Sequence, residues 1–115
     1  MTVRLEVAPL LAQLRGRGDK WWGFSGEPTR EEITRAMENG EFEEERNDGD
    51  RYPGDRGRHV RRIAYLCAHP KGLRELDEPV EIVNGVLVNG AHRVLAAHFL
   101  GRAHVDAACS QTTAV

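Results

Sequence analysis

The sequence predicts a small α+β domain in which helices flank a sheet. Three patterns indicate this class: a β-hairpin signature at 80–88, a helix that follows it directly from Ala91, and a second helix with its own capping signal near residue 30. The chain has 115 residues, which suits one domain rather than two. We therefore expect a single domain over residues 1–115.

The composition excludes several classes of protein. The chain carries 16 Lys+Arg and 18 Asp+Glu, for a formal charge of −2, which disfavours a protein that coats nucleic acid but leaves a local basic patch open. Its apolar runs are shorter than the roughly 18 residues of a membrane span, and its start lacks a secretory signal. We expect a cytoplasmic protein with no membrane partner. Cys67 and Cys109 lack the spacing of a zinc site and are expected to be packing residues.

The first half of the chain has only short apolar stretches. Apolar and charged residues alternate over 3–7, which predicts an edge strand, and the leucines at 10–14 indicate a helical turn. Thr29 and Glu32 have the spacing of a capping box, so a helix is predicted from about Arg30 to Asn39. It should end at the glycine that follows.

An aromatic cluster lies between these elements, formed by Trp21, Trp22 and Phe24. Such a cluster either fills the core or stacks on a nucleic-acid base. Because small domains use tryptophan mainly for buried area, the core is the preferred interpretation.

The charge changes sign sharply near residue 50. Seven acidic residues and one arginine lie between Glu38 and Asp50, which we interpret as a mobile acidic surface loop at about 38–50. Five arginines and one acid follow between Arg51 and Arg62, and an apolar stripe predicts a helix over 58–68. Basic side chains such as Arg58, His59 and Arg62 do not suit a helix N-terminus. A bound anion or nucleic acid would relieve the misfit, as would the acidic segment folding back.

The second half contains the clearest local signals. Val80 and Ile82, then Val86 and Val88, alternate on either side of Asn84-Gly85, the pair best suited to a type I′ turn. A helix is predicted after Gly90, with Gly101 as its C-terminal cap and a strand at about 105–108 beyond it.

The start of that helix is the main candidate site. Its first amides are unpaired and the helix dipole is positive there, so it can receive an anion. The candidate phosphate-binding residues are Asn89, Gly90, Ala91, His92 and Arg93. A generic helix start, with Arg93 buried against an acid, is the alternative interpretation.

The segments 78–82, 85–97, 100–101 and Val105, with the helix before them, resemble the ParB/sulfiredoxin superfamily, including its ParB-like nuclease-domain members. The resemblance covers residues 58–110, which form the recognisable core, and leaves 1–57 as a divergent N-terminal part. It implies a mixed sheet with a β-hairpin, a Gly-x-His-Arg helix and flanking helices. It also implies that the helix start holds nucleotide phosphates.

The resemblance implies further site residues. Arg58, His59 and Arg62 of the upstream helix would make secondary phosphate or nucleic-acid contacts across the same pocket. The ligand would be ATP or CTP, with Mg²⁺ held by a carboxylate. Glu81 is the candidate for that carboxylate, and Asp77, Glu78 and Asp106 are further acids without a fixed motif. Sulfiredoxin activity is not expected, because Ala91 stands where those enzymes place their catalytic cysteine.

Two classes of function follow. The first is a nucleotide-binding domain, with NTPase or phosphotransferase activity left open and no catalytic residue identified. The second is a non-catalytic regulatory module that binds DNA or a protein through the basic face from Arg51 to Arg62. A metal site from His92, His98 and His104 is not expected, because residues six apart on a helix point about 120° from each other.

Overall fold

The computed structural model describes residues 2–17, 21–23, 26–45 and 56–111. These residues form an α+β domain with a four-stranded mixed sheet and five helices. In chain order the elements are β1 (Thr2–Glu6), α1 (Val7–Gly16), α3 (Arg30–Glu38), α4 (Arg56–Ala68), α5 (Pro70–Leu76), β2 (Val80–Val83), β3 (Val86–Asn89), α6 (Ala91–Phe99) and β4 (His104–Ser110).

The sheet has the strand order β1-β4-β2-β3. Strand β4 pairs antiparallel with β1 and parallel with β2, while β2 and β3 form an antiparallel hairpin. Asn84 (φ 52°) and Gly85 (φ 80°) both have positive φ, as a type I′ turn requires. The predicted hairpin is therefore confirmed.

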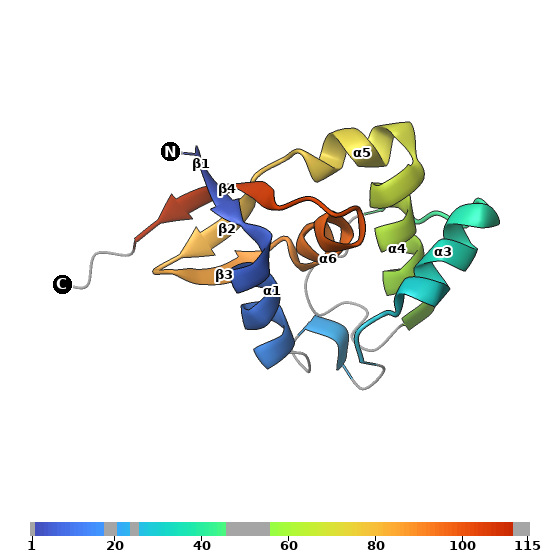
Figure 1. Cartoon of the computed structure of the whole chain (residues 1–115), viewed down its shortest axis with the longest axis horizontal. Coiled ribbons are helices and arrows are strands. Elements are labelled where there is room, and N and C mark those ends of the chain that lie inside the picture. The colour runs from blue at the N-terminus through green and yellow to red at the C-terminus, as the bar shows by residue number, and fades with distance from the viewer. Residues whose placement is uncertain (1, 18–20, 24–25, 46–55, 112–115) are drawn as a thin grey trace.

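Helix α6 lies at the centre of the domain. Figure 1 shows the sheet at one end of the molecule, α6 beside it, and α4 and α3 beyond. Four consecutive residues of α6, Val94 to Ala97, have no exposed surface. A helix that is apolar on all sides must be buried on all sides, and α6 accordingly contacts α1, α4, α5 and β4.

The start of α6 is fixed by a close approach to the sheet. Gly90 has a φ of 114°, which is strained for any residue with a side chain. A Cβ built at Gly90 would lie 2.6 Å from Val80 Cγ1. The glycine is therefore needed for the helix to begin directly against β2.

Other elements extend beyond their predicted bounds. Helix α1 spans ten residues rather than one turn after Pro9, and it begins at Val7, which was expected to end the strand. Strand β4 also starts earlier and ends later than predicted. Helix α5 was not predicted. Its start has two recognisable signals: Pro70 occupies the first turn, and the His69 side chain accepts a hydrogen bond from the Lys71 amide.

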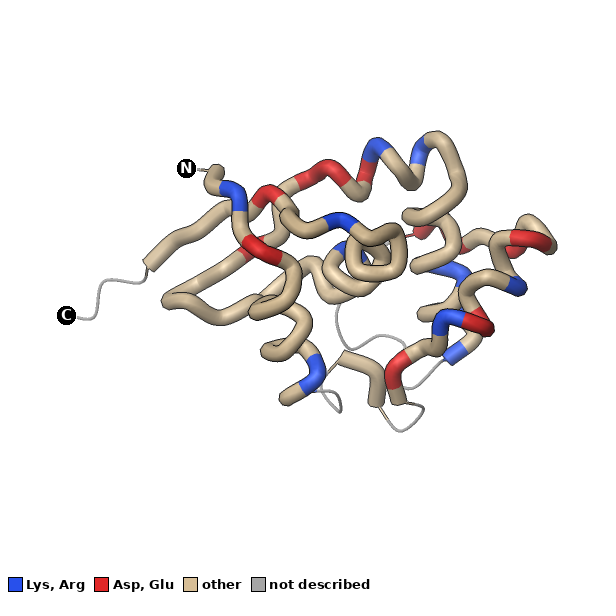
Figure 2. Tube along the Cα trace, in the orientation of Figure 1, with Lys and Arg blue, Asp and Glu red and all other residues tan. Residues whose placement is uncertain are grey.

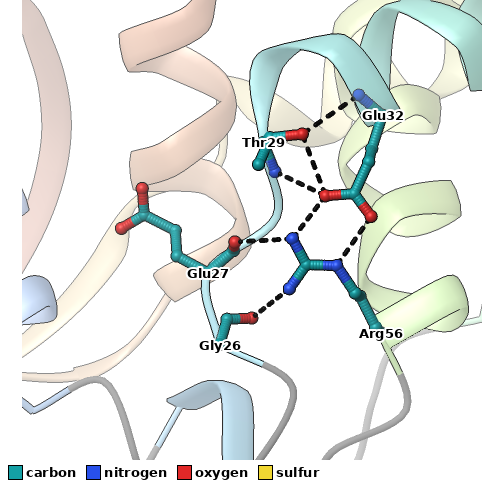
Figure 3. A network of polar contacts seen from close by, with 5 residues as sticks. All are labelled: Gly26, Glu27, Thr29, Glu32 and Arg56. Atoms are coloured by element: carbon teal, nitrogen blue, oxygen red, sulfur yellow. Dashed lines mark hydrogen bonds and ion pairs between the residues drawn. The ribbon is translucent and has the colours of Figure 1, made fainter.

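Helix α3 confirms the predicted capping box. The Thr29 side chain accepts from the Glu32 amide, and the Glu32 carboxylate accepts from the Thr29 amide at 3.0 Å. Figure 3 shows that Arg56 of α4 joins this network. Its Nε donates to Glu32 at 2.6 Å, and its guanidinium also donates to the carbonyls of Gly26 and Glu27. The cap of α3 thus ties it to the start of α4.

Some of the aromatic and cysteine side chains that were expected to pack in the core do so. Trp22 is 1% exposed and belongs to the core, as expected, while Phe24 lies outside the described residues. Cys67 is buried, and burial raises the pKa of its thiol to about 11, so it is an inert packing residue. Cys109 is exposed.

Within the described ranges, no helix is long and apolar enough to cross a membrane.

Replacing Gly90 by alanine should destabilise the domain strongly. The new Cβ would meet Val80 and the backbone would keep a strained φ, so we expect a loss of about 2–5 kcal/mol in the free energy of unfolding. Urea denaturation measures this loss. Gly16→Ala is the matched control, because a Cβ at that position would meet nothing within 4 Å. Equal stability of the two variants would contradict the role given to Gly90.

Replacing Arg56 by alanine should weaken the link between α3 and α4. Both side chains of the pair are about one-third exposed, so after screening we expect a loss of about 0.5–1.5 kcal/mol. The Arg56 guanidinium lowers the pKa of Glu32 to about 2 from its usual 4.5. The stabilisation is therefore present above pH 4.5 and declines as the pH falls towards 2. Denaturation of wild type and Arg56→Ala across this window should show the difference shrinking, whereas a constant difference would contradict it.

Candidate functional site

By helix geometry, the first amides of α6 have no partner within the helix. Its N-cap is Gly90, no side chain caps it, and no acid lies in the first turn. The first bond within the helix runs from the Val94 amide to the Gly90 carbonyl at 2.9 Å. Gly90 and Ala91 are buried, while Asn89 before them is exposed.

Helix α4 lies against this first turn through two histidines. Nδ1 of His59 and Nε2 of His92 are 2.9 Å apart, a hydrogen-bond distance. The Trp22 ring packs edge-on against both, with centroids 5.2 Å from His59 and 5.5 Å from His92. His59 is 1% exposed, whereas His92 is only partly buried. The structure therefore brings together two predicted site residues that are 33 positions apart in the sequence.

His92 is held in its neutral form. Burial is the largest cause that lowers the pKa of His92 to about 3, followed by the neighbouring His59, Arg62 and Arg93. Each of these neighbours disfavours a positive charge on His92. At neutral pH the imidazole of His92 is uncharged, so it can contribute to a site as a hydrogen-bonding group rather than as a cation.

The side chain of Arg93 does not point towards the predicted phosphate site. Its guanidinium is buried and donates to the carbonyls of Glu78 at 3.0 Å and Pro79 at 2.7 Å. These carbonyls belong to the segment that leads into β2. Arg93 therefore braces the start of α6 against the start of the hairpin, instead of pointing its fork at a phosphate.

The basic residues of α4 face acidic neighbours. Arg62 forms a buried ion pair with Glu75 of α5 and also donates to the carbonyls of Glu43 and Glu44. Arg58 lies 3.7 Å from Glu43 and 3.5 Å from Glu45. In Figure 2 acidic and basic positions are interspersed over this part of the molecule.

The described part of the acidic segment differs from the expected mobile loop. Residues 41–45 dock onto α4: Phe42 packs against the core, and the Glu43 amide donates to the Arg61 carbonyl at 3.2 Å. Positions 46–55, which include Arg51, lie outside the described residues. The misfit of arginines at the start of α4 is thus relieved by the acidic segment folding back, one of the two alternatives that the sequence left open.

The candidate magnesium carboxylate belongs to the residue paired with Asn89, but it lies on the face of the sheet away from α6. Val80 and Ile82 of β2 are buried towards α6, so the exposed Glu81 between them lies on the opposite face of the sheet. Asp106 of β4 is likewise exposed between two buried neighbours, so it too lies on that opposite face. Neither carboxylate can therefore hold Mg²⁺ against an anion at the start of α6, and the structure does not fit that role for Glu81.

The remaining candidates are dispersed. Asp77 pairs with Arg102 at 2.7 Å, away from the histidine pair. His98 lies near the end of α6 and His104 is exposed on β4. Among the described residues, no three side chains of the histidine, cysteine or acidic types gather as a metal site.

Trp22 is the residue of this site that the sequence did not assign to it. Sequence reasoning placed it in the core, which is correct, but gave no sign that its ring would contact the histidine pair. The only signal was its position among glycines, which does not specify a partner.

The pH dependence of stability should report the histidine pair. Because the folded pKa of His92 is lowered, the unfolded chain binds the proton first, and stability falls as the pH drops below 6.5. His92 contributes at most about 1.4 kcal/mol per pH unit to the slope, and His98, whose pKa is also lowered, adds to it. Denaturation between pH 7.5 and 5 measures it above the range in which Glu32 titrates. His92→Gln should reduce this slope, and an unchanged slope would contradict a neutral His92.

Comparison with protein-family profiles, curated proteins and solved structures finds no match for this chain.

Proposed function

We propose that the chain binds a nucleotide through its phosphates at the first turn of α6, as a domain of the ParB/sulfiredoxin type. The observation that carries the proposal is the uncapped first turn, with no acidic residue, placed against His59 of α4. The backbone amides after Gly90 and the His92 side chain are the proposed contacts. Arg93 acts as a brace for them and not as a phosphate ligand.

Helix-terminus chemistry supports this choice of ligand. Unpaired amides and the positive end of the dipole favour an anion at this position. His92 adds a neutral hydrogen-bonding group with part of its surface exposed. If His59 donates to Nε2 of His92, the proton of His92 is on Nδ1, which can then donate to a phosphate oxygen.

The order of elements supports the resemblance on which the nucleotide is proposed. Helix α4 precedes the β2–β3 hairpin, α6 follows directly after Gly90, and β4 pairs parallel with β2 inside the sheet. Helix α5 is an addition between the upstream helix and the hairpin. Neither the sequence similarity nor the order of elements depends on charge. Both therefore support the proposal independently of the anion argument.

The proposal is limited to nucleotide binding and includes no catalytic step. Glu81 and Asp106 face away from α6, so neither is positioned to hold Mg²⁺ there. ATP and CTP are both suitable probes, and each should be tested with and without Mg²⁺. Nucleic-acid binding through α4 is not favoured, because Arg56, Arg58 and Arg62 each contact a glutamate.

Asn89→Asp tests the proposal without removing a structural contact. The new carboxylate would lie just before the N-cap of α6 and opposite Glu81, its cross-strand partner in β2, so we expect only a small loss of stability. The same charge should repel a phosphate and weaken nucleotide binding about tenfold, or about 1.4 kcal/mol. Isothermal calorimetry with ATP and CTP measures the affinity, and denaturation measures the stability.

Asn84→Asp is the matched control. It makes the same change in the turn between β2 and β3, where aspartate also suits the type I′ geometry. Its affinity for nucleotide should equal that of the wild type. Absence of binding to the wild type, or equal weakening by both variants, would overturn the site at α6.

A further inference from the structure

The two edges of the sheet differ in how they are covered. Strand β3 forms one edge and β1 forms the other. At the β3 edge the side chain of Gln13 takes the place of a neighbouring strand: its Oε1 accepts from the Leu87 amide at 3.0 Å, and its Nε2 donates to the Gly85 carbonyl at 3.1 Å. Because α1 starts at the end of β1 and reaches the β3 turn through Gln13, it leads away from the edge formed by β1.

The backbone groups at the outer edge of β1 have no such cover among the described residues. The Val7 amide donates to the Ala103 carbonyl at 2.8 Å, so this opposed pair is a hydrogen-bonded one. Bonded and non-bonded pairs alternate along an antiparallel ladder, so the odd-numbered residues of β1 bond to β4. The Glu6 amide and both backbone groups of Arg4 therefore point towards the free edge.

The side chains at the same two positions carry opposite charges. Arg4 and Glu6 are exposed on the face of β1 away from α6, and neither forms an ion pair with another described residue. Across the ladder, Arg4 lies opposite Asp106 and Glu6 lies opposite His104. Charged side chains commonly keep edge strands apart. Two charges of opposite sign on one edge can instead match the same pair on a second copy.

We propose that the free edge of β1 pairs antiparallel with the same edge of a second copy of this chain, about a two-fold axis at Leu5. In this register Arg4 of each copy lies opposite Glu6 of the other, and each Glu6 amide donates to the Arg4 carbonyl across the edge. The neighbouring registers that the backbone allows place Arg4 against Arg4 or Glu6 against Glu6, and like charges directly opposite are destabilising. Charge therefore selects one of the registers that the backbone groups permit.

The two-fold axis also brings apolar surface together. Leu5 is only partly buried, and it lines a hollow of about 770 Å³ together with Leu10 and Ile82. In the proposed register the two Leu5 residues form a non-hydrogen-bonded pair, in which side chains approach closely. The dimer thus joins two sheets into one. It does not depend on nucleotide binding, because it uses no residue of the first turn of α6.

Sedimentation equilibrium of the full chain tests the association. The contact is small, so we expect a reversible monomer–dimer equilibrium with a dissociation constant between about 10 μM and 1 mM. A chain that stays monomeric at about 1 mM would overturn the proposal.

A charge exchange tests the register. Arg4→Glu and Glu6→Arg each place like charges opposite each other in the homodimer, so each should weaken it at least about tenfold. In a mixture of the two variants, two acidic positions of one chain meet two basic positions of the other, and dimers should form again. A misfolded variant cannot produce this rescue. Arg35→Glu, exposed on α3, is the control and should dimerise as the wild type does. Failure of the mixture to dimerise, or equal weakening by Arg35→Glu, would contradict the register.

Glu6→Pro tests the backbone contact. Glu6 has a φ of −70° and follows an extended residue, so proline fits the fold there and removes no bond to β4. It should retain the stability of the monomer and weaken the dimer at least about tenfold through loss of the edge donor. Glu6→Gln removes the same charge but keeps the amide, so it should dimerise more tightly than Glu6→Pro. Equal affinities of these two variants would contradict the contact.

Amide hydrogen exchange followed by NMR locates the dimer contact. At low concentration the Glu6 amide should exchange faster than the Leu5 amide, which bonds to β4. Raising the protein concentration should slow exchange at Glu6. Protection that appears along β3 instead, with Glu6 unchanged, would place the contact at the other edge of the sheet and overturn the assignment.

Discussion

The placement of α6 against β2 is the contact on which the rest of the domain depends. Gly90 allows the helix to begin where any side chain would collide with Val80, and Val94 to Ala97 are then enclosed on all sides. Because closely packed cores tolerate little displacement, this contact also fixes the position of the first turn relative to α4. The approach of His92 to His59 is therefore a consequence of packing at Gly90.

The adjacent His92 and Arg93 have separate roles. Arg93 turns to the carbonyls that precede β2, so its charge is used inside the fold, whereas His92 turns to α4 and stays neutral. The same division holds on α4, where Arg62 contacts Glu75 and His59 contacts His92. The arginines thus stabilise the frame of the candidate site.

Elements with local signals could be predicted from the sequence. Asn84-Gly85 specifies the hairpin, Thr29 and Glu32 specify the start of α3, and Gly90 marks the start of α6, because each acts within a few residues. The direction of Arg93 could not be predicted, since it depends on two carbonyls 14 and 15 positions earlier. The position of Trp22 against the histidine pair is likewise set by tertiary packing.

The two ends of α6 carry different chemistry. At its N-terminus the dipole is positive and no acidic side chain lies in the first turn, which favours the proposed anion there. At its C-terminus the dipole opposes an anion, and the basic side chain of the last turn is His98, whose pKa is lowered first by burial and then by Arg15 and Arg30. The dipole therefore favours the start of α6 over its end for the proposed nucleotide.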